Sequence, residues 1–357
     1  MAFVLSTAKM MAEHRYTQSE AEPWISDWIE SRGGNPDIAV RMNRNAEVGW
    51  RSSVLPIEDV FRPKSLTESN QIYEAGMIRL GAEVSRRAIE AAGIEPADID
   101  LLVSVSCTGF MIPSVDAYLI DELGMGPETK RLPITEMGCA AGAVGLSRVR
   151  EYLLGFPHHR VLLVSVELPT LTFQLDNLSM DNIVSVAIFG DGAAAAVLGG
   201  EPREGAPELV DSRTVTLPGS MDLMGFNLSD AGFQIILSKE IPQAVKARVR
   251  PIVEAFLGCN ELSLEAIDHL LFHPGGKRIL EVYRDELGVT KEALHYSRKI
   301  LNECGNVSSA TILMILDEAL SSGETKAGDT GLLLAMGPAT LLPSAQAAKY
   351  KVVELQP

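Results

Sequence analysis

Apolar residues along the chain group into short unbroken runs that are separated by longer stretches of helical spacing. Two runs are "RVLLVSVE" (160–167) and "TGLLLAMG" (330–337), and similar runs lie near the ends of the segments 89–109 and 253–276. Such runs are typical of strands buried on both faces, as in a sheet that helices cover on each side. Because helical stretches stand between the runs, the chain is predicted to consist of βα units.

The same pattern occurs twice. In both 89–109 and 253–276, a helical pattern ends near a glycine, a short polar link follows, and an apolar strand runs into small residues. Further on, "TEMGCAAGAVGLSRVREYLLG" (135–155) aligns with "NECGNVSSATILMILDEALSSG" (302–323). Each contains Glu, one further residue, Gly, and then Cys or Asn before a helix. We interpret the repetition as an internal duplication.

The duplication predicts two α/β halves, residues 1–205 and 206–357, that pack as pseudo-symmetric partners. A chain of 357 residues also exceeds the roughly 250 to 300 residues at which a single hydrophobic core stops growing. In this arrangement Cys139 and Asn306 occupy equivalent positions, and His273 ends the strand one unit before Asn306. Since α/β proteins place their sites at strand ends and helix starts, we expect these three side chains to converge.

Cys139, His273 and Asn306 together suit nucleophilic catalysis on an acyl group. The start of a helix favours a thiolate, and a nearby histidine can take the thiol proton. An asparagine can donate a hydrogen bond without becoming anionic, which suits stabilisation of negative charge on a carbonyl oxygen. Taken singly, each residue also fits a structural role, as a buried thiol, a turn histidine or a helix N-cap. The combination favours the catalytic interpretation.

Composition and charge exclude several other classes of function. The net charge of −16 repels phosphate backbones, so we expect no nucleic-acid partner, and an anionic ligand needs a local basic patch. No apolar stretch is long enough to cross a membrane and the first residues lack a secretory signal, which favours a cytoplasmic protein. The four cysteines have no paired short spacing, so we expect neither a disulfide framework nor a zinc site.

Four motifs in combination resemble the type III polyketide synthases, the chalcone-synthase-like enzymes of the thiolase fold. They are "GCAAG" around Cys139, "FGDGAAAAVLG" from Phe189, "HPGG" from His273 and "GNVSSAT" around Asn306. The resemblance covers nearly the whole chain. It implies an α/β, thiolase-like fold whose duplicated βα halves form a five-layered αβαβα core, and it implies a homodimer.

The resemblance also implies a reaction. In the family, the residue that matches Cys139 is acylated from a coenzyme A (CoA) thioester. The residues that match His273 and Asn306 bind the thioester carbonyl of malonyl-CoA during decarboxylation and condensation. Decarboxylation leaves an enolate whose oxygen needs hydrogen-bond donors, and the reaction requires no metal or redox cofactor.

Further positions of the cavity follow from the resemblance. Phe189 matches a gatekeeping phenylalanine between the CoA tunnel and the cavity, and Ile235 replaces a second one, which predicts a wider doorway. Ile112 matches the loop that reaches the partner subunit, and Ala339 replaces a glycine that supports the cyclisation pocket. Four other residues match positions that line or shape the cavity: Cys107, Thr108, Thr172 and Ser308.

Two regions of the chain match the segments that bind the CoA phosphates in enzymes of the family. The resemblance assigns this role to Arg44, Arg51, Gly276, Lys277 and Arg278, with Arg41, Arg62 and Lys64 nearby. Ala46 and Glu47 depart from the pattern, because plant members carry basic or neutral residues there.

We therefore expect a type III polyketide synthase that extends an acyl-CoA starter on Cys139 with malonyl-CoA. The expected product is an alkylpyrone, an alkylresorcinol or a related phenol. Residues 221–242 resemble enzymes with fatty acyl starters and favour a medium or long chain, whereas 106–114 are shared with enzymes that make small phenols from malonyl units alone.

Three further functions are compatible with the same residue types. They are a ketoacyl-carrier-protein synthase III-like enzyme, a cysteine hydrolase and a binding protein without catalysis. The first of these takes malonyl groups from an acidic carrier protein and needs a basic docking face, which the net charge of −16 disfavours. The hydrolase would use water as the acceptor, and the binding protein would leave Cys139 without an acyl group.

Overall fold

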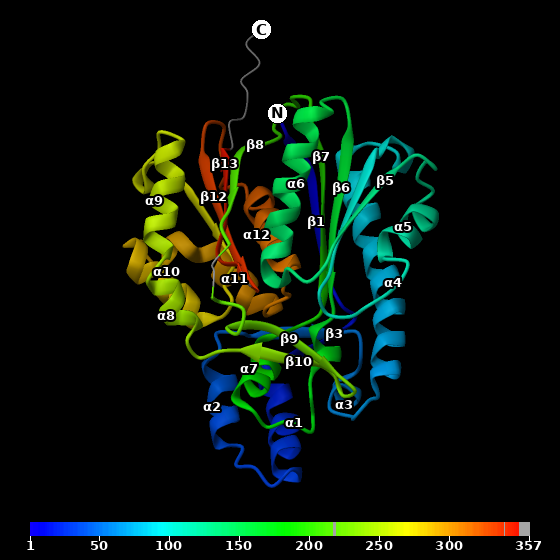
Figure 1. The fold of residues 1–357 in the computed structure, drawn as a ribbon, viewed down its shortest axis with the longest axis vertical. Coiled ribbons are helices and arrows are strands. Elements are labelled where there is room, and N and C mark those ends of the chain that lie inside the picture. Colours follow the sequence, from blue (N-terminus) through cyan, green and yellow to red (C-terminus); the bar gives the residue numbers. More distant parts are fainter. Residues whose placement is uncertain (217–218, 339, 350–357) are drawn as a thin grey trace.

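A computed structural model of the protein describes residues 1–216, 219–338 and 340–349. Strands of the largest sheet follow the order β11-β12-β13-β8-β1-β7-β6-β4-β5 (Figure 1). The N-terminal half-sheet comprises β1 (Phe3–Met11), β7 (Gly192–Gly199), β6 (Arg160–Glu167), β4 (Leu101–Val105) and β5 (Lys130–Ile134). The C-terminal half-sheet comprises β8 (Glu208–Thr214), β13 (Thr340–Lys349), β12 (Thr330–Gly337) and β11 (His269–Phe272). Within the described parts, β1 and β8 share one pair in register, Phe3 with Glu208.

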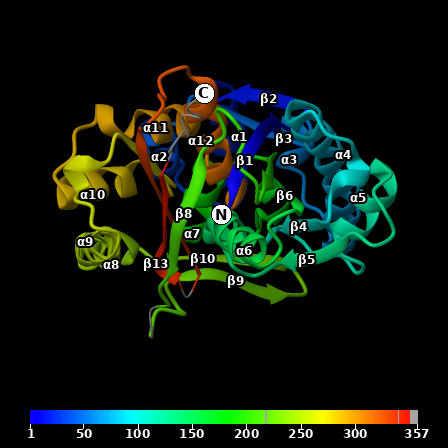
Figure 2. The ribbon, with the colours of Figure 1, turned by 90° about the horizontal axis from the view of Figure 1, so that it is seen from above.

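Two helices, α6 (Ala141–Gly155) and α12 (Ala310–Ser321), lie between the half-sheets (Figure 2). Helix α6 contacts β4 and β6 as well as β8, β12 and β13, and α12 contacts β1, β7 and β11. The outer face of the N-terminal half-sheet is covered by α4 (Leu66–Ala92) and α5 (Val115–Leu123). The outer face of the C-terminal half-sheet is covered by α8 (Ile241–Lys246) and α9 (Val249–Cys259), and α10 (Lys277–Leu287) packs against these two helices. The order of layers is therefore αβαβα, as the resemblance implied.

Small and apolar side chains allow this stacking. Every residue of β7, with the sequence GAAAAVLG, is buried, because helices cover the strand on both faces. The two central helices approach so closely that a Cβ atom at Gly142 would overlap the carbonyl oxygen of Ser309. The small residues that follow Cys139 in the sequence thus permit the central layer to pack.

The remaining elements form a cap at the lower end of the molecule in Figure 1. They are α1 (Gln18–Ser31), α2 (Asp37–Asn45), α3 (Ile57–Val60), α7 (Met180–Ile188), β2 (His14–Thr17), β3 (Trp50–Ser53), β9 (Met224–Ser229) and β10 (Gly232–Leu237). Helix α11 (His295–Cys304) packs against α12 and β3 and so links the cap to the central layer. No helix of the described chain has the length and apolarity needed to cross a membrane.

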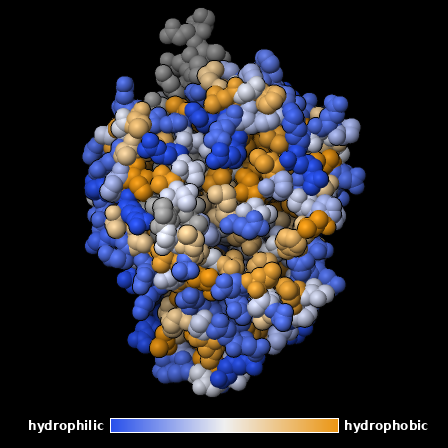
Figure 3. All heavy atoms as spheres, in the orientation of Figure 1, coloured by the Kyte–Doolittle hydropathy of each residue, from blue (hydrophilic) through white to orange (hydrophobic). Residues whose placement is uncertain are grey.

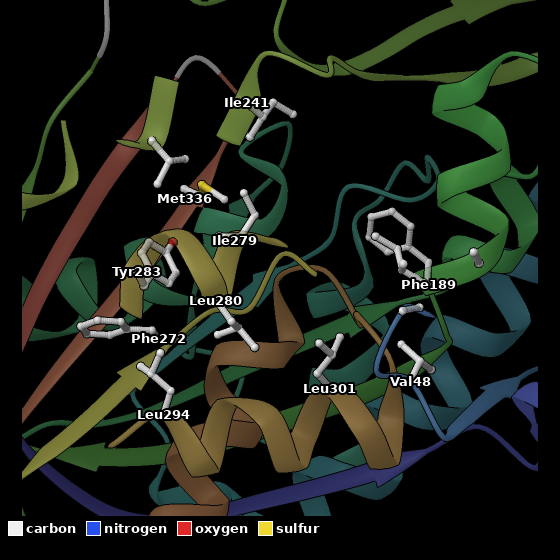
Figure 4. Close-up of a cluster of buried hydrophobic side chains, with 14 of the residues drawn as sticks. Val48, Phe189, Ile241, Phe272, Ile279, Leu280, Tyr283, Leu294, Leu301 and Met336 are labelled. Atoms are coloured by element: carbon white, nitrogen blue, oxygen red, sulfur yellow. The ribbon is translucent and has the colours of Figure 1, made fainter. Parts of the chain in front are cut away.

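A cluster of buried side chains includes Phe272, the residue directly before His273. Phe272 and Tyr283 pack edge to face with ring centroids 5.3 Å apart, and Leu280 and Met336 belong to the same cluster (Figure 4). The strands predicted at 160–167 and 330–337 are confirmed as β6 and β12. The domain boundary near residue 205 stays a prediction.

Candidate active site

Cys139, His273 and Asn306 come from three parts of the chain and line one small cavity. Cys139 lies in a 3₁₀ turn, Gly138–Ala140, that leads directly into α6. His273 follows the last residue of β11, and Asn306 lies in the loop between α11 and α12. The cavity has a volume of about 60 Å³. The predicted convergence of these three residues is confirmed.

The glycine before Cys139 is required by the turn. Gly138 has a φ of 52°, which glycine adopts without strain, and a Cβ atom at this position would overlap the ring of Pro338. Because the backbone turns sharply here and helix α6 begins at Ala141, the thiol of Cys139 faces the cavity at the mouth of the helix.

Asn306 is held by backbone pairing as well as through its side chain. Its backbone forms a parallel bridge with Phe189, and its N–H donates to the carbonyl of Ile188 at 2.8 Å. The side-chain Oδ1 accepts from the Ser308 N–H at 2.8 Å, while Nδ2 donates to the Gly275 carbonyl at 3.1 Å. An amide NH₂ has two hydrogens, so one remains to donate to a bound substrate.

The interpretation of Asn306 as a mere helix cap is wrong. Helix α12 begins at Ala310, and its N-cap position is taken by Ser309. Asn306 therefore lies outside α12, and its side chain lines the cavity.

The ring of His273 is fully buried and its two nitrogens have distinct roles. The Gly275 N–H donates to Nδ1 at 3.0 Å, so the proton of the neutral ring lies on Nε2, which donates to the Ser308 carbonyl at 3.1 Å. Burial lowers the pKa of His273 to about 4. The ring is thus neutral at pH 7 and presents Nε2–H as a hydrogen-bond donor.

Burial also governs the state of the Cys139 thiol. It raises the pKa of Cys139 to about 12, although hydrogen bonds from Ser308 and Asn306 act in the opposite direction. The Sγ atom lies 3.6 Å from Ser308 Oγ. The helix start was expected to favour a thiolate paired with an imidazolium. Burial acts against this pair, because it raises the pKa of the Cys139 thiol and lowers the pKa of the His273 ring. The thiolate–imidazolium pair stays a prediction.

Glu167 is a buried residue of the site that the sequence analysis missed. It ends β6, accepts hydrogen bonds from the Cys107 N–H at 3.1 Å and Thr108 Oγ1 at 2.8 Å, and is also bonded to the Ser309 hydroxyl. Burial raises the pKa of its carboxyl group, while these donors lower it. The available signal was a single acid at the end of an otherwise apolar strand.

The residues predicted to line the cavity are largely brought together. Around Cys139, His273 and Asn306, the cavity is lined by Phe189, Ile235, Cys107, Thr108, Thr172 and Ser308. Ile112 lies elsewhere, on the loop before α5, with 81% of its surface exposed. Ala339 lies outside the described residues.

A second, larger cavity adjoins the catalytic one. Its volume is about 590 Å³, and the two share Cys107, Gly138, Phe226 and Ile236 in their walls. Much of its remaining lining is apolar: Tyr73, Met77, Val105, Met111, Val115 and Ile134. Figure 3 shows apolar side chains gathered on the corresponding face, beside α6 and above the β9–β10 hairpin.

The residues predicted to bind CoA phosphates differ in their exposure and in their ion pairs. Arg44 is exposed and pairs with Glu22 at 2.5 Å, and Lys277 pairs with Glu47 at 3.4 Å. Gly276 is the N-cap of α10, whose second residue, Arg278, forms no salt bridge within the described ranges.

The prediction that Arg51 binds a CoA phosphate is wrong. Its side chain is fully buried, and Nη1 donates to the backbone carbonyls of Val186 and Phe189 at the end of α7. The guanidinium also lies 5.4 Å from the ring centre of Tyr16. Arg51 cannot reach a phosphate in solvent. It instead supports the helix end that carries Phe189.

Arg51→Met should therefore destabilise the fold. The substitution removes a buried, charge-assisted donor and leaves carbonyls at the end of α7 without a partner, which typically costs about 2 to 4 kcal/mol. Urea unfolding followed by circular dichroism measures the free energy of unfolding. The control is Arg44→Met, which changes an exposed arginine and should shift that free energy by less than about 0.5 kcal/mol. Equal, small shifts in both variants would refute the role assigned to Arg51.

Comparison with known proteins gives consistent matches over most of the chain. Residues 58–202 match the family described as chalcone and stilbene synthases, N-terminal domain, and residues 208–344 match the C-terminal domain of that family. A 1,3,6,8-tetrahydroxynaphthalene synthase of Streptomyces peucetius is 37% identical, with 91% of this chain and 87% of the relative covered. A phloroglucinol synthase of Pseudomonas fluorescens is 32% identical over 92% of this chain and 94% of the relative.

Comparison with solved structures identifies the same family. The crystal structure of 1,3,6,8-tetrahydroxynaphthalene synthase from Streptomyces coelicolor, a bacterial type III polyketide synthase, is similar with a TM-score of 0.91 at 29% identity. The similarity covers 98% of this chain and 99% of that one.

Proposed function

The chain belongs to the chalcone and stilbene synthase family and is a type III polyketide synthase, and we propose that it extends a medium- or long-chain acyl-CoA with malonyl-CoA. The observation that carries the proposal is the position of Cys139, His273 and Asn306 around a cavity that opens into a larger apolar one. The expected products are alkylpyrones, alkylresorcinols or related phenols.

In the loading step, the Cys139 sulfur attacks the thioester carbonyl of the starter. The S–C bond to CoA breaks, CoA leaves, and the acyl group remains on Cys139. The thiol proton passes to the departing CoA thiolate. His273 carries its proton on Nε2 and accepts the Gly275 N–H at Nδ1, so it donates Nε2–H to the developing oxyanion. Because the free thiol has a pKa of about 12, deprotonation accompanies binding rather than preceding it.

In the extension step, malonyl-CoA loses CO₂ and becomes an enolate. The enolate oxygen accepts hydrogen bonds from His273 Nε2–H and from the free amide hydrogen of Asn306. The enolate carbon then attacks the acyl group on Cys139, the bond to sulfur breaks, and a β-ketoacyl-CoA forms. This product can reload onto Cys139 for another round.

The cavity volumes support an extended acyl chain. Ligand pockets for drug-sized molecules typically have volumes of roughly 300 to 1,000 Å³. The catalytic cavity, at about 60 Å³, is far below that range, whereas the adjoining cavity, at about 590 Å³, lies within it. We infer that an acyl chain too long for the catalytic cavity extends past Cys107 into the adjoining, largely apolar cavity, where each buried methylene contributes about 0.8 kcal/mol.

A second candidate function is synthesis of a small polyhydroxylated aromatic from malonyl-CoA alone. The naphthalene and phloroglucinol synthases among the relatives favour it, as does the shared stretch 106–114. The two candidates differ first in the starter. A ketoacyl-carrier-protein synthase III-like activity has less support, because the net charge of −16 disfavours docking of an acidic carrier.

Ile235→Phe distinguishes the two candidates. Ile235 lies on β10 in the wall of the catalytic cavity, opposite the register position of Phe226 on β9. Added bulk here should cost roughly 1 to 3 kcal/mol in transition-state stabilisation for long starters and little for acetyl-CoA or malonyl-CoA. The measurement is kcat/KM across acyl lengths, normalised by the yield of acylated Cys139.

Two outcomes would contradict this proposal. An equal loss at every acyl length would make Ile235 a packing residue rather than a gate. A wild-type enzyme that turns over malonyl-CoA only would establish the second candidate.

The homodimer and the cytoplasmic location stay predictions. Support for a dimer comes from β5, an edge strand of the sheet whose first four residues are exposed, and from the exposed Ile112. Edge strands with unpaired backbone groups commonly pair with another chain.

A further inference from the structure

Glu47 occupies the middle of the basic region near the catalytic cavity. It follows the end of α2, and one carboxylate oxygen lies 3.4 Å from Lys277 Nζ. The other oxygen forms an ion pair with Arg298 Nη1. One internal anion therefore engages two cations that come from different helices, α10 and α11.

The two cations stand beside the start of α10, close to the active site. Lys277 is the first residue of α10, and no side chain of the described residues caps this helix. Gly275, two residues earlier, lines the catalytic cavity and accepts the hydrogen bond from Asn306. An uncapped helix start next to two cations attracts anions. In the free protein, the anion beside these two cations is the carboxylate of Glu47.

Two features distinguish this cluster from an ordinary surface ion pair. Glu47 has a φ of 57°, in the left-handed region that side chains other than glycine and asparagine rarely adopt, so the surrounding structure holds it in a strained conformation. The Nε atom of Arg298 is buried and has no hydrogen-bond partner among the described parts of the chain, on a side chain with 12% exposure. Arg298 therefore retains an unused donor.

The backbone around Glu47 is fixed in place. The Asn302 amide donates to the Glu47 carbonyl at 3.4 Å, and the Gly49 N–H donates to the Asn302 carbonyl at 2.8 Å. The Glu47 side chain is 31% exposed, and these backbone hydrogen bonds do not involve its carboxylate.

We propose that Glu47 is a displaceable internal anion that sets the affinity for CoA thioesters. In the empty enzyme its carboxylate forms ion pairs with Lys277 and Arg298. When CoA binds, a phosphate group replaces the carboxylate at these two cations, and the ion pairs with Glu47 form again when free CoA dissociates. The inference rests on the proposed function, since it takes CoA thioesters as the substrates. A polyketide synthase must bind and release CoA at every extension, so a carboxylate that competes with the phosphate speeds each release.

The test compares Glu47→Gln with Glu83→Gln. Both substitutions remove one negative charge, but Glu83 lies on α4 and pairs with Arg87. Calorimetry with free CoA gives the dissociation constant, and steady-state kinetics give KM for malonyl-CoA. The malonyl thioester of N-acetylcysteamine, which lacks the phosphates, is the second substrate.

Glu47→Gln should tighten CoA binding and lower KM for malonyl-CoA by roughly three- to tenfold. KM for the N-acetylcysteamine thioester should not change, and Glu83→Gln should leave every value within about twofold. Adding Lys277→Gln to Glu47→Gln should remove the gain, because one of the released cations is then absent. If Glu47→Gln folds poorly, Glu47→Asp, with its shorter reach, should shift binding in the same direction.

Three results would overturn the proposal. Unchanged or weaker CoA binding in Glu47→Gln would mean that Glu47 orients the cations. An equal change with the N-acetylcysteamine thioester would place the effect in the cavity rather than at the phosphates. The same gain in Glu83→Gln would reduce the effect to net charge. A wild-type enzyme that binds CoA but does not turn over malonyl thioesters would refute the proposed function and leave the binding test valid.

Discussion

Cys139→Ala should abolish acyl loading and product formation. The variant lacks the sulfur that holds the growing chain, and loss of a catalytic nucleophile typically lowers the rate on the order of 10⁴- to 10⁶-fold. Cys139 lies in the turn that opens α6 and faces the cavity, whereas Cys259 is exposed at the end of α9. Intact-protein mass spectrometry after incubation with starter CoA should show one adduct in wild type and in Cys259→Ala, and none in Cys139→Ala.

Cys139→Ala should still decarboxylate malonyl-CoA, because the donors of His273 and Asn306 do not depend on the thiol. An adduct that persists in Cys139→Ala, or that peptide mapping places on Cys107, would contradict the assignment. Cys107 is the relevant competitor, since its sulfur and that of Cys139 both contact Ser308 Oγ, at 3.4 and 3.6 Å.

Asn306→Ala should slow decarboxylation of malonyl-CoA by about 10² to 10³-fold, the usual effect of removing one donor to a developing oxyanion. Starter loading should suffer much less, because it produces no enolate. Release of CO₂ and the yield of acylated Cys139 report the two steps separately. Asn260→Ala, at the end of α9 and outside the cavity lining, is the matched control.

Asn306 also takes part in the local backbone arrangement, so a second variant is needed. Asn306→Asp preserves the shape of the side chain but replaces the donor by a negative charge beside the enolate. It should slow decarboxylation at least as strongly as Asn306→Ala. Wild-type decarboxylation in either variant would return Asn306 to a purely structural role in pairing with Phe189 and Ser308.

The sequence predicted those features that depend on local pattern. The apolar runs at 160–167 and 330–337 became buried strands because their composition suits a sheet covered on both faces. The duplication placed Cys139 and Asn306 in equivalent units, which brought them together around α6 and α12. Small residues after Cys139 proved necessary for the close approach of these helices.

Features that depend on tertiary burial were not predictable in this way. Arg51 and the exposed Arg44 are both arginines in the same basic stretch, so the sequence does not distinguish their burial. Arg51 is buried because it packs against the end of α7 and the ring of Tyr16. The pKa of Cys139 is set by burial, which the position at a helix start does not reveal. Glu167 and the 590 Å³ cavity likewise arise from segments that meet only in the folded chain.

The most direct test of the central claim is mass spectrometry of the products that the wild-type enzyme forms from malonyl-CoA and a panel of starters from acetyl-CoA to stearoyl-CoA. We expect products that contain the intact starter chain plus acetate-derived units, with kcat/KM rising with acyl length until the apolar cavity is full. We also expect that none of these products forms with Cys139→Ala. Products derived from malonyl units alone, or hydrolysis of the starter without extension, would contradict the proposed function.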